Sequence, residues 1–334
     1  MNQRAARWKA GIWIFLGFML MLSVLVGSVS IPIKELWRSV WASGEGTFRT
    51  ILLDLRLPRT ILMAMTGAAL AGSGAAYQGL FRNPLADPYL IGVASGAGLG
   101  AVVGMSLRMQ SAQFGALFIP MMAFAAGLIT VMLVYGLAKS GRSVPASNLI
   151  LAGVAVSSFA TALTSFLMLR STGEVRRALS WLLGGASFTG WQPVLAMLPY
   201  WLVGLALLLP LGHALNVLQF GDDQAHQLGL PVEKVRRRVL VAASLTTAAA
   251  VAFAGIIGFV GLIVPHILRM TLGADSRKLL RYSVIGGAGL LLAADIVARV
   301  ILSPQELPVG IVTALMGAPF FLWILKRSRA GVWN

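Results

Sequence analysis

The 334 residues are 57% hydrophobic and 11% charged, against about 25% charged residues in soluble domains, which excludes a water-soluble globular protein. The formal net charge of +16 falls mainly between apolar stretches, so we attribute it to membrane topology and not to nucleic-acid binding. The absence of cysteine excludes disulfides, thiol catalysis and thiolate metal sites, and the three histidines lack metal-ligand spacing.

The apolar runs predict an all-α, polytopic membrane protein with a single transmembrane domain, residues 1–334. At about 20 residues per membrane helix, this length allows about ten spans. Hydropathy and the Gly, Pro and charged residues between the runs place these spans at 11–30, 60–80, 90–107, 116–138, 147–169, 193–214, 237–254, 257–272, 283–299 and 308–325.

The first run resembles a signal peptide, with Arg4, Arg7 and Lys9 before it, but it is too long for one. We interpret it as a retained span with a cytoplasmic N-terminus, and an even number of spans then makes the C-terminus cytoplasmic too. In that orientation 17 basic residues are cytoplasmic and 10 are not, as the positive-inside rule expects. Ten is still a high number for the outer face, which indicates an acidic partner there.

Two arginines surround Pro58 at the predicted outer start of the second span. Pro58 suits a first helical turn, where the partial positive charge of the helix end adds to Arg56 and Arg59. This arrangement favours an arriving anion, either an acidic partner or a lipid phosphate. Asp54 could offset part of the charge.

Glycines recur every fourth residue from Gly92 through Gly96 and Gly100 to Gly104. They line one side of a helix without side chains, which favours close packing of a neighbouring helix over a moving seam.

The longest polar cytoplasmic insertion is the loop from Gly221 to Arg238, interrupted at Gly229 and Pro231. Two short helices around that interruption would form a surface projection suited to a partner. An ordinary basic connector is the alternative.

No spacing of nucleophiles, acids and bases indicates an enzyme, and the pair Asp222 and Asp223 lacks the second acidic cluster of a magnesium-diphosphate site. No GxxxxGK[ST] loop is present, so ATP hydrolysis would need another polypeptide. Asp295 and Arg299 are the exceptional ionisable residues within a span, and at i,i+4 they are expected to pair. An ion-coupled secondary transporter is therefore the second hypothesis, and a membrane enzyme the third.

Several long motifs resemble the FecCD-type permeases of type II ABC importers, the iron-siderophore, haem and cobalamin class. They are RLPR at 56–59, GAALAGSGAAYQGLFRNPLADPYLIGVASGAG at 67–98, LAGVAV at 151–156, LNVLQFGDDQAHQLGL at 215–230, GIIGFVGLIVPHILR at 255–269, ADIVAR at 294–299 and ELPVGIVTALMGAPFF at 306–321.

This resemblance implies a permease in the bacterial cytoplasmic (inner) membrane that imports a ferric siderophore, with cobalamin or haem as alternatives. It implies a second permease subunit, identical or related, two cytoplasmic ATPases that bind ATP and magnesium, and an extracytoplasmic binding protein. This chain itself is expected to bind no cofactor or metal.

The resemblance also assigns roles to residues. Binding-protein docking would fall to Arg56, Arg59 and Arg299. ATPase coupling, within a segment at about 216–236, would fall to Gly221, Asp222, Ala225, Leu228, Gly229 and Leu230. The translocation path and its gates would be formed by Asn83, Leu85, Ala146, Ser147, Ser157, Ser158, Thr161, Thr164 and Ser165.

Overall fold

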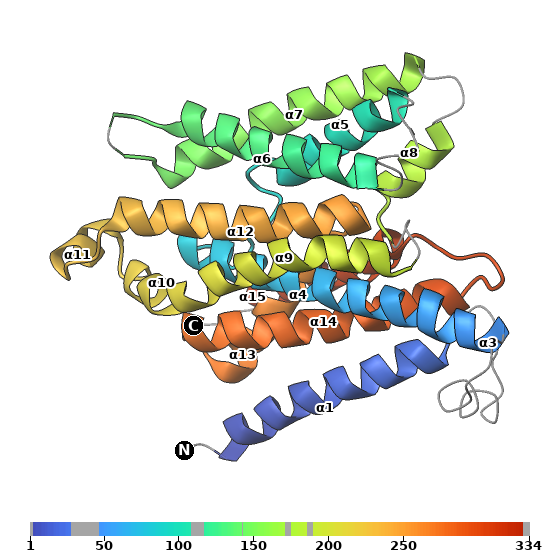
Figure 1. The fold of residues 1–334 in the computed structure, drawn as a ribbon. Coiled ribbons are helices and arrows are strands. Elements are labelled where there is room, and N and C mark those ends of the chain that lie inside the picture. The colour runs from blue at the N-terminus through green and yellow to red at the C-terminus, as the bar shows by residue number, and fades with distance from the viewer. Residues whose placement is uncertain are drawn as a thin grey trace.

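A computed structural model describes residues 3–27, 47–107, 117–141, 143–170, 175–185 and 190–329. Helices form the regular structure of these ranges, which otherwise contain one isolated bridge between Ser140 and Ser143. The two labelled chain ends lie toward the end of the bundle that carries α11 (Asp222–Gln227), and α3 (Thr47–Thr50) lies at the opposite end (Figure 1). We refer to these as the α11 end and the α3 end.

Ten apolar helices account for the predicted spans. Seven are long and apolar enough to cross a bilayer: α1 (Gln3–Leu25), α4 (Leu57–Leu80), α6 (Phe118–Ala138), α7 (Ala146–Arg170), α9 (Trp191–Leu208), α12 (Val232–Ala254) and α14 (Ser276–Val300). Three are shorter: α5 (Val93–Ser106), α13 (Val260–Leu272) and α15 (Val309–Arg329), the last apolar over Val309–Ile324. The prediction of an all-α, multi-pass membrane protein with about ten spans is confirmed.

Short helices connect these elements: η1 (Ile51–Arg56), η3 (Leu209–Leu211), α10 (Gly212–Leu218) and α8 (Val175–Leu182). The sequence analysis missed α8. Its eight residues are too few for a span search, and Arg176 and Arg177 give it a polar surface, while Ala178 and Trp181 are buried.

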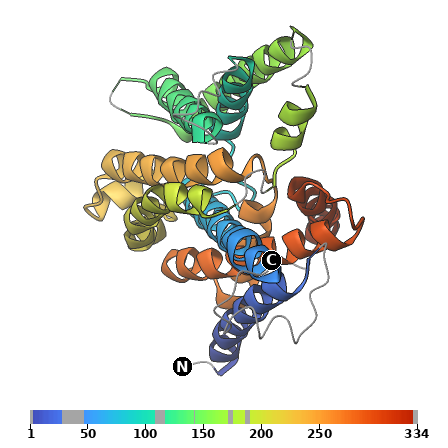
Figure 2. The ribbon, with the colours of Figure 1, turned by 45° about the vertical axis from the view of Figure 1, so that its right-hand side comes forward.

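Helix α4 forms the centre of the bundle and is buried along most of its length. It packs against α9, α12, α13 and α14, while α5, α6 and α7 form a layer on the other side of α12 (Figures 1 and 2). Small residues of α4 let neighbouring backbones approach closely: a methyl group at Gly74 would overlap the carbonyl oxygen of Gly261. Some polar groups are paired within this core, as in the 2.8 Å hydrogen bond between the hydroxyls of Tyr77 and Ser244, whereas the buried hydroxyls of Thr66 and Thr247 have no hydrogen-bond partner among the described residues.

The predicted close packing along the glycine row is confirmed. A methyl group at Gly96 would overlap Thr130 on α6, and one at Gly100 would overlap the carbonyl oxygen of Met122. The row therefore serves as the contact between α5 and α6.

Irregular backbone segments meet inside the bundle where α8, α12 and α15 begin or end. The amide of Gly185 donates to Ala254 O at 2.7 Å, and the Tyr89 hydroxyl donates to Ile257 O at 2.8 Å. These bonds satisfy backbone groups that a membrane interior would otherwise leave unpaired. The same region ends at Phe259, a non-glycine residue at φ +68°, from which α13 begins.

Asp275 caps the start of α14, where its carboxylate accepts from Arg277 N at 3.1 Å and from Asn216 Nδ2 at 2.8 Å. Burial alone would raise the pKa of Asp275, but the hydrogen bonds from Asn216 and Arg277 outweigh it and lower the pKa below its ordinary value. The cap therefore stabilises the folded chain above the ordinary aspartate pKa of about 3.9 and loses this effect as the pH falls below it.

We expect Asp275→Ala to reduce the free energy of unfolding by about 1 kcal/mol at neutral pH, the usual effect of losing an N-cap. Thermal unfolding in detergent at pH 7 and near pH 3 measures this difference, which should shrink at the lower pH. Asp275→Asn keeps a capping side chain without the charge, so at pH 7 it should lose less stability than Asp275→Ala and should lack the pH dependence of the parent. A full loss in the asparagine variant would contradict the capping assignment.

Candidate functional site

An ionic cluster lies at the α3 end of the bundle. Arg59 Nη2 is 2.9 Å from Asp295 Oδ1, and Arg59 Nη1 is 2.6 Å from Glu306 Oε2. Arg299 Nε is 3.0 Å from Asp295 Oδ2, which confirms the predicted i,i+4 pair, although this contact lacks hydrogen-bond geometry. The cluster thus joins α4, α14 and the segment before α15.

The guanidinium groups of Arg56 and Arg299 reach the last carbonyls of α1. Arg56 Nη1 donates to Leu25 O at 2.9 Å, and Arg299 Nη1 donates to Val26 O at 2.9 Å. The last carbonyls of a helix lack partners within it and carry partial negative charge, which explains why two cations gather there. Arg56 is 6% exposed and Arg299 is 2% exposed.

Of the three arginines predicted to dock a binding protein, Arg59 keeps the most exposed side chain, at 20%. The other two hold α1 in place within the described chain, so their proposed docking would require a rearrangement at this end.

The expectation of a free helix end at Arg56 and Arg59 is wrong. Pro58 does lie in the first turn of α4, but α3 and the π-helical η1 precede it without a break. The amide of Leu57 bonds to Leu52 O, five residues back, and this wider turn admits a proline in a continuing helix. Asp54 is exposed, and Arg59 pairs instead with Asp295 and Glu306.

At the α11 end, the predicted coupling segment forms a projection. Gly221 at φ +105° and Gly229 at φ +81° bound α11, and these are conformations that suit glycine. Leu228 points outward at 68% exposure, while Ala225 is fully buried and Leu230 packs against the core. One part of the prediction is wrong: a single short helix precedes Pro231, and the second is the start of α12 itself.

Asp222 connects this projection to two other segments. Arg236, which is 5% exposed, places Nη2 2.6 Å from Asp222 Oδ2 and Nη1 2.6 Å from Glu233 Oε1. Arg82 Nη2 lies 3.6 Å from Asp222 Oδ1. The i,i+3 spacing of Glu233 and Arg236 marks their pair in the sequence. The contacts of Asp222 could not be predicted, because no pattern marks a pairing between residues as distant as Arg82 and Asp222.

The predicted gate residues lie in the segment after α4 and at the start of α7. Asn83 Oδ1 accepts from Leu85 N at 2.9 Å, in the irregular segment that follows Arg82, and Leu85 is 54% exposed. Ala146 and Ser147 form the first turn of α7. Their role as gates stays a prediction.

The predicted polar wall of α7 is partly exposed and partly buried, and its role in a translocation path stays a prediction. Ser158, Thr161 and Ser165 are exposed, whereas Ser157 is partly buried near Gly92, and Thr164 is 6% exposed and donates to Ala160 O at 2.7 Å. The five positions lie on one stripe of α7, at i, i+1, i+4, i+7 and i+8. Ser157 and Thr164 form its buried edge, and Ser158, Thr161 and Ser165 form its exposed part.

No group of three or more His, Asp or Glu side chains within the described ranges is placed to hold a metal ion. The candidate functional residues lie at the two ends of the bundle and along α7.

The model of the FecCD transport family matches residues 15–327. The chain is 42% identical to the ABC transporter permease YvrB of Bacillus subtilis (strain 168), over 99% of this chain and 96% of that protein. It is 47% identical to the cobalamin import permease BtuC of Halobacterium salinarum, over 84% and 74%, and 39% identical to the hemin permease HmuU of Yersinia pestis, over 95% and 96%. A solved metal-chelate type ABC transporter in an inward-facing conformation matches with a TM-score of 0.82 at 30% identity, over 96% of this chain and 99% of that one.

Proposed function

Because this chain belongs to the FecCD transport family, and is thus a permease subunit of a type II ABC importer, we propose that it carries a metal chelate, with a ferric siderophore as the first choice. The observation that carries this proposal is the similarity, over 84% to 96% of this chain, to permeases named for cobalamin and hemin and to a metal-chelate type transporter. Each of these cargoes is a metal held by an organic chelator. Cobalamin and haem are the alternatives.

The transporter we propose contains two permease subunits, two ATPases that bind ATP and magnesium, and an extracytoplasmic binding protein. The α11 projection supports the ATPase contact, since its buried Ala225 fixes it to the body while Leu228 is left outward. The α11 end is then cytoplasmic, in the inner membrane of a bacterium, together with both termini. The α3 end, with Arg59, meets the binding protein.

In this mechanism ATP binding draws the ATPases together and shifts α11. Asp222 passes that shift to Arg82 and so to the segment Asn83–Leu85, because it is paired with Arg82 at 3.6 Å. The helices then exchange an inner opening for an outer one. Import is the direction because the loaded binding protein is present on the outer side alone.

The experiment is reconstitution of the chain with a candidate ABC ATPase, with binding proteins preloaded with ferric siderophore, haem or cobalamin. Stimulation of ATP hydrolysis and uptake by one loaded binding protein supports the proposal and identifies the cargo. Uptake that needs an ion gradient and no ATP would favour the ion-coupled transporter instead.

We expect Leu228→Glu to lower this stimulated ATPase rate at least about tenfold, because a charge would replace an outward apolar side chain at the contact. The control is Gln227→Glu, which adds the same charge at an exposed position of α11 on a different face from Leu228 and should leave the rate close to that of the parent. Equal rates in the parent and in Leu228→Glu would remove α11 from the ATPase contact.

A further inference from the structure

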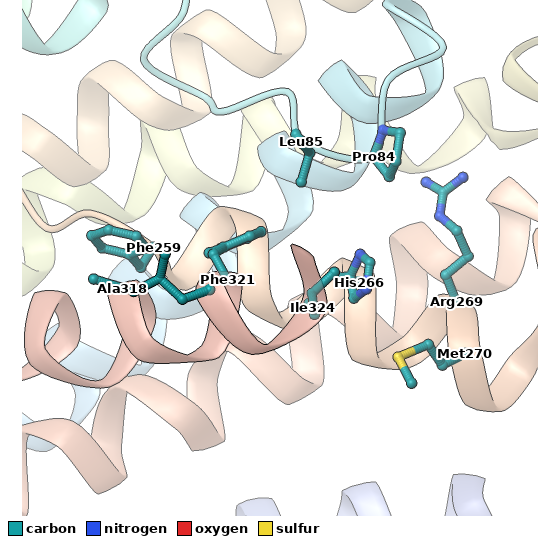
Figure 3. A pocket seen from close by; sticks show the side chains of 10 residues that line it. Pro84, Leu85, Phe259, His266, Arg269, Met270, Ala318, Phe321 and Ile324 are labelled. Atoms are coloured by element: carbon teal, nitrogen blue, oxygen red, sulfur yellow. The ribbon is translucent and has the colours of Figure 1, made fainter. Parts of the chain in front are cut away.

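A cavity of about 730 Å³ lies between α13, α15 and the segment before α5. Its volume is within the range of about 300 to 1,000 Å³ typical of small-molecule sites. Figure 3 shows Phe259 and Phe321 at one end of this space and Arg269 and Met270 at the other, with Leu85 pointing in from the opposite wall. The walls are mainly apolar and aromatic.

Arg269 introduces a positive charge into this apolar lining. Its Nη2 donates to Gln78 Oε1 at 3.3 Å, and no carboxylate of the described chain pairs with it. Arg269 Nε and His266 Nδ1 are buried without a hydrogen-bond partner among the described residues. A half-buried cation without a carboxylate partner and with one buried donor unused is costly, and a ligand with an oxyanion would lower that cost.

Two neighbours fix the direction of these side chains. His266 and Arg269 are three residues apart and share one face of α13. The His266 ring meets Phe320 edge-on at 6.1 Å, and Gln78, which is 1% exposed on α4, holds the guanidinium from behind. Figure 3 shows Arg269 extending toward Pro84, so the cation faces the wall that contains Leu85.

The wall opposite Arg269 is connected to the α11 projection. Leu85 lies three residues after Arg82, which is paired with Asp222 of α11. An occupant of the cavity would therefore contact the segment that the proposed mechanism moves. This connection favours transported cargo over a resident lipid as the occupant.

We propose that this cavity is an exit subsite, where Arg269 and His266 receive an acidic group, carboxylate or phosphate, carried on the bulky apolar body of the chelate. Phe259 and Phe321 contact that body, and movement of Leu85 releases it. This inference rests on the proposed function, and it narrows the cargo to chelates with a negatively charged group.

The test compares chelates that differ in their acidic group, using the full-length protein in phosphatidylcholine nanodiscs. Three probe pairs are used: haemin and haemin dimethyl ester, cyanocobalamin and dicyanocobinamide, and a ferric tris-catecholate and a neutral ferric trihydroxamate. In at least one pair the acidic form should bind about tenfold more tightly. Arg269→Met should abolish this preference, and Arg269→Lys should keep part of it. The control is Arg281→Met, an exposed arginine of α14, which should leave the preference unchanged.

Absence of any preference for acidic forms, absence of binding, or a preference that survives Arg269→Met in a protein with the parent's unfolding temperature overturns the inference. Nanodiscs with phosphatidylglycerol separate the lipid source: binding of that lipid that depends on Arg269, without a preference for acidic chelates, assigns the cavity to lipid. ATP-driven uptake is measured separately. Uptake by the parent without the acidic preference overturns this inference alone, whereas absent uptake overturns the proposed function.

Discussion

Asp295→Ala should lower the free energy of unfolding by about 3 to 5 kcal/mol, the range for removing one member of a buried ion pair. Asp295 is fully buried between Arg59 and Arg299. Its removal leaves Arg299, at 2% exposure, without its carboxylate. Arg59 would retain Glu306, which is 35% exposed and a weaker compensation.

Thermal and denaturant unfolding of the purified protein in detergent micelles measures this loss. Asp54→Ala is the matched control, because Asp54 is an exposed aspartate at the same end of the bundle; its effect should stay within about 0.5 kcal/mol. Equal stability of the two variants would show that the cluster does not hold α4 to α14.

The second large effect is expected from Gly74→Ala. An alanine favours a helix over glycine by about 1 kcal/mol, but the new methyl group would overlap the carbonyl oxygen of Gly261 on α13. Backbone cannot move aside as a side-chain end can, so overpacking of about 3 kcal/mol or more outweighs the helix propensity. The result should be a less stable protein or one that fails to accumulate in the membrane.

Gly79→Ala is the control on the same helix. The nearest atom to its methyl group would be Leu215 Cδ2 at 3.3 Å, the end of a flexible side chain. The unfolding temperatures and the membrane yields of both variants measure the difference. A Gly74→Ala protein as stable as Gly79→Ala would mean that α4 and α13 are less closely packed than described.

Hydropathy predicted the ten apolar helices because a bilayer imposes length and apolarity on each span. Hydropathy predicted the ends of these helices less well where the chain bends inside the bundle. The span predicted from residue 90 begins at Val93, after an irregular segment that Tyr89 fixes to Ile257. Such a bend depends on a partner 168 positions away, which no local pattern records.

In the candidate site, too, local features could be predicted from the sequence and long-range contacts could not. The boundaries of α11 follow from Gly221 and Gly229, because both have positive φ angles that glycine adopts more readily than other residues. The burial of Arg56 and Arg299 does not follow from their type, since arginine is usually exposed. Their partners are the carbonyl groups at the end of α1. Because every residue has a backbone carbonyl, no sequence motif identifies these partners.

The central position of α4 also has a consequence for biosynthesis. The candidate span Thr47–Leu80, which contains α4, has the lowest mean hydropathy, 1.2, among the seven long candidate spans. The partner helix α12 begins 152 positions after α4 ends. At about 5 to 20 residues per second of translation, α4 waits roughly 8 to 30 seconds in the membrane before that partner is synthesised. During this interval Ser73, Gln78 and the glycines of α4 lack the partners that cover them in the folded chain, so we expect another protein surface to cover them until the core closes.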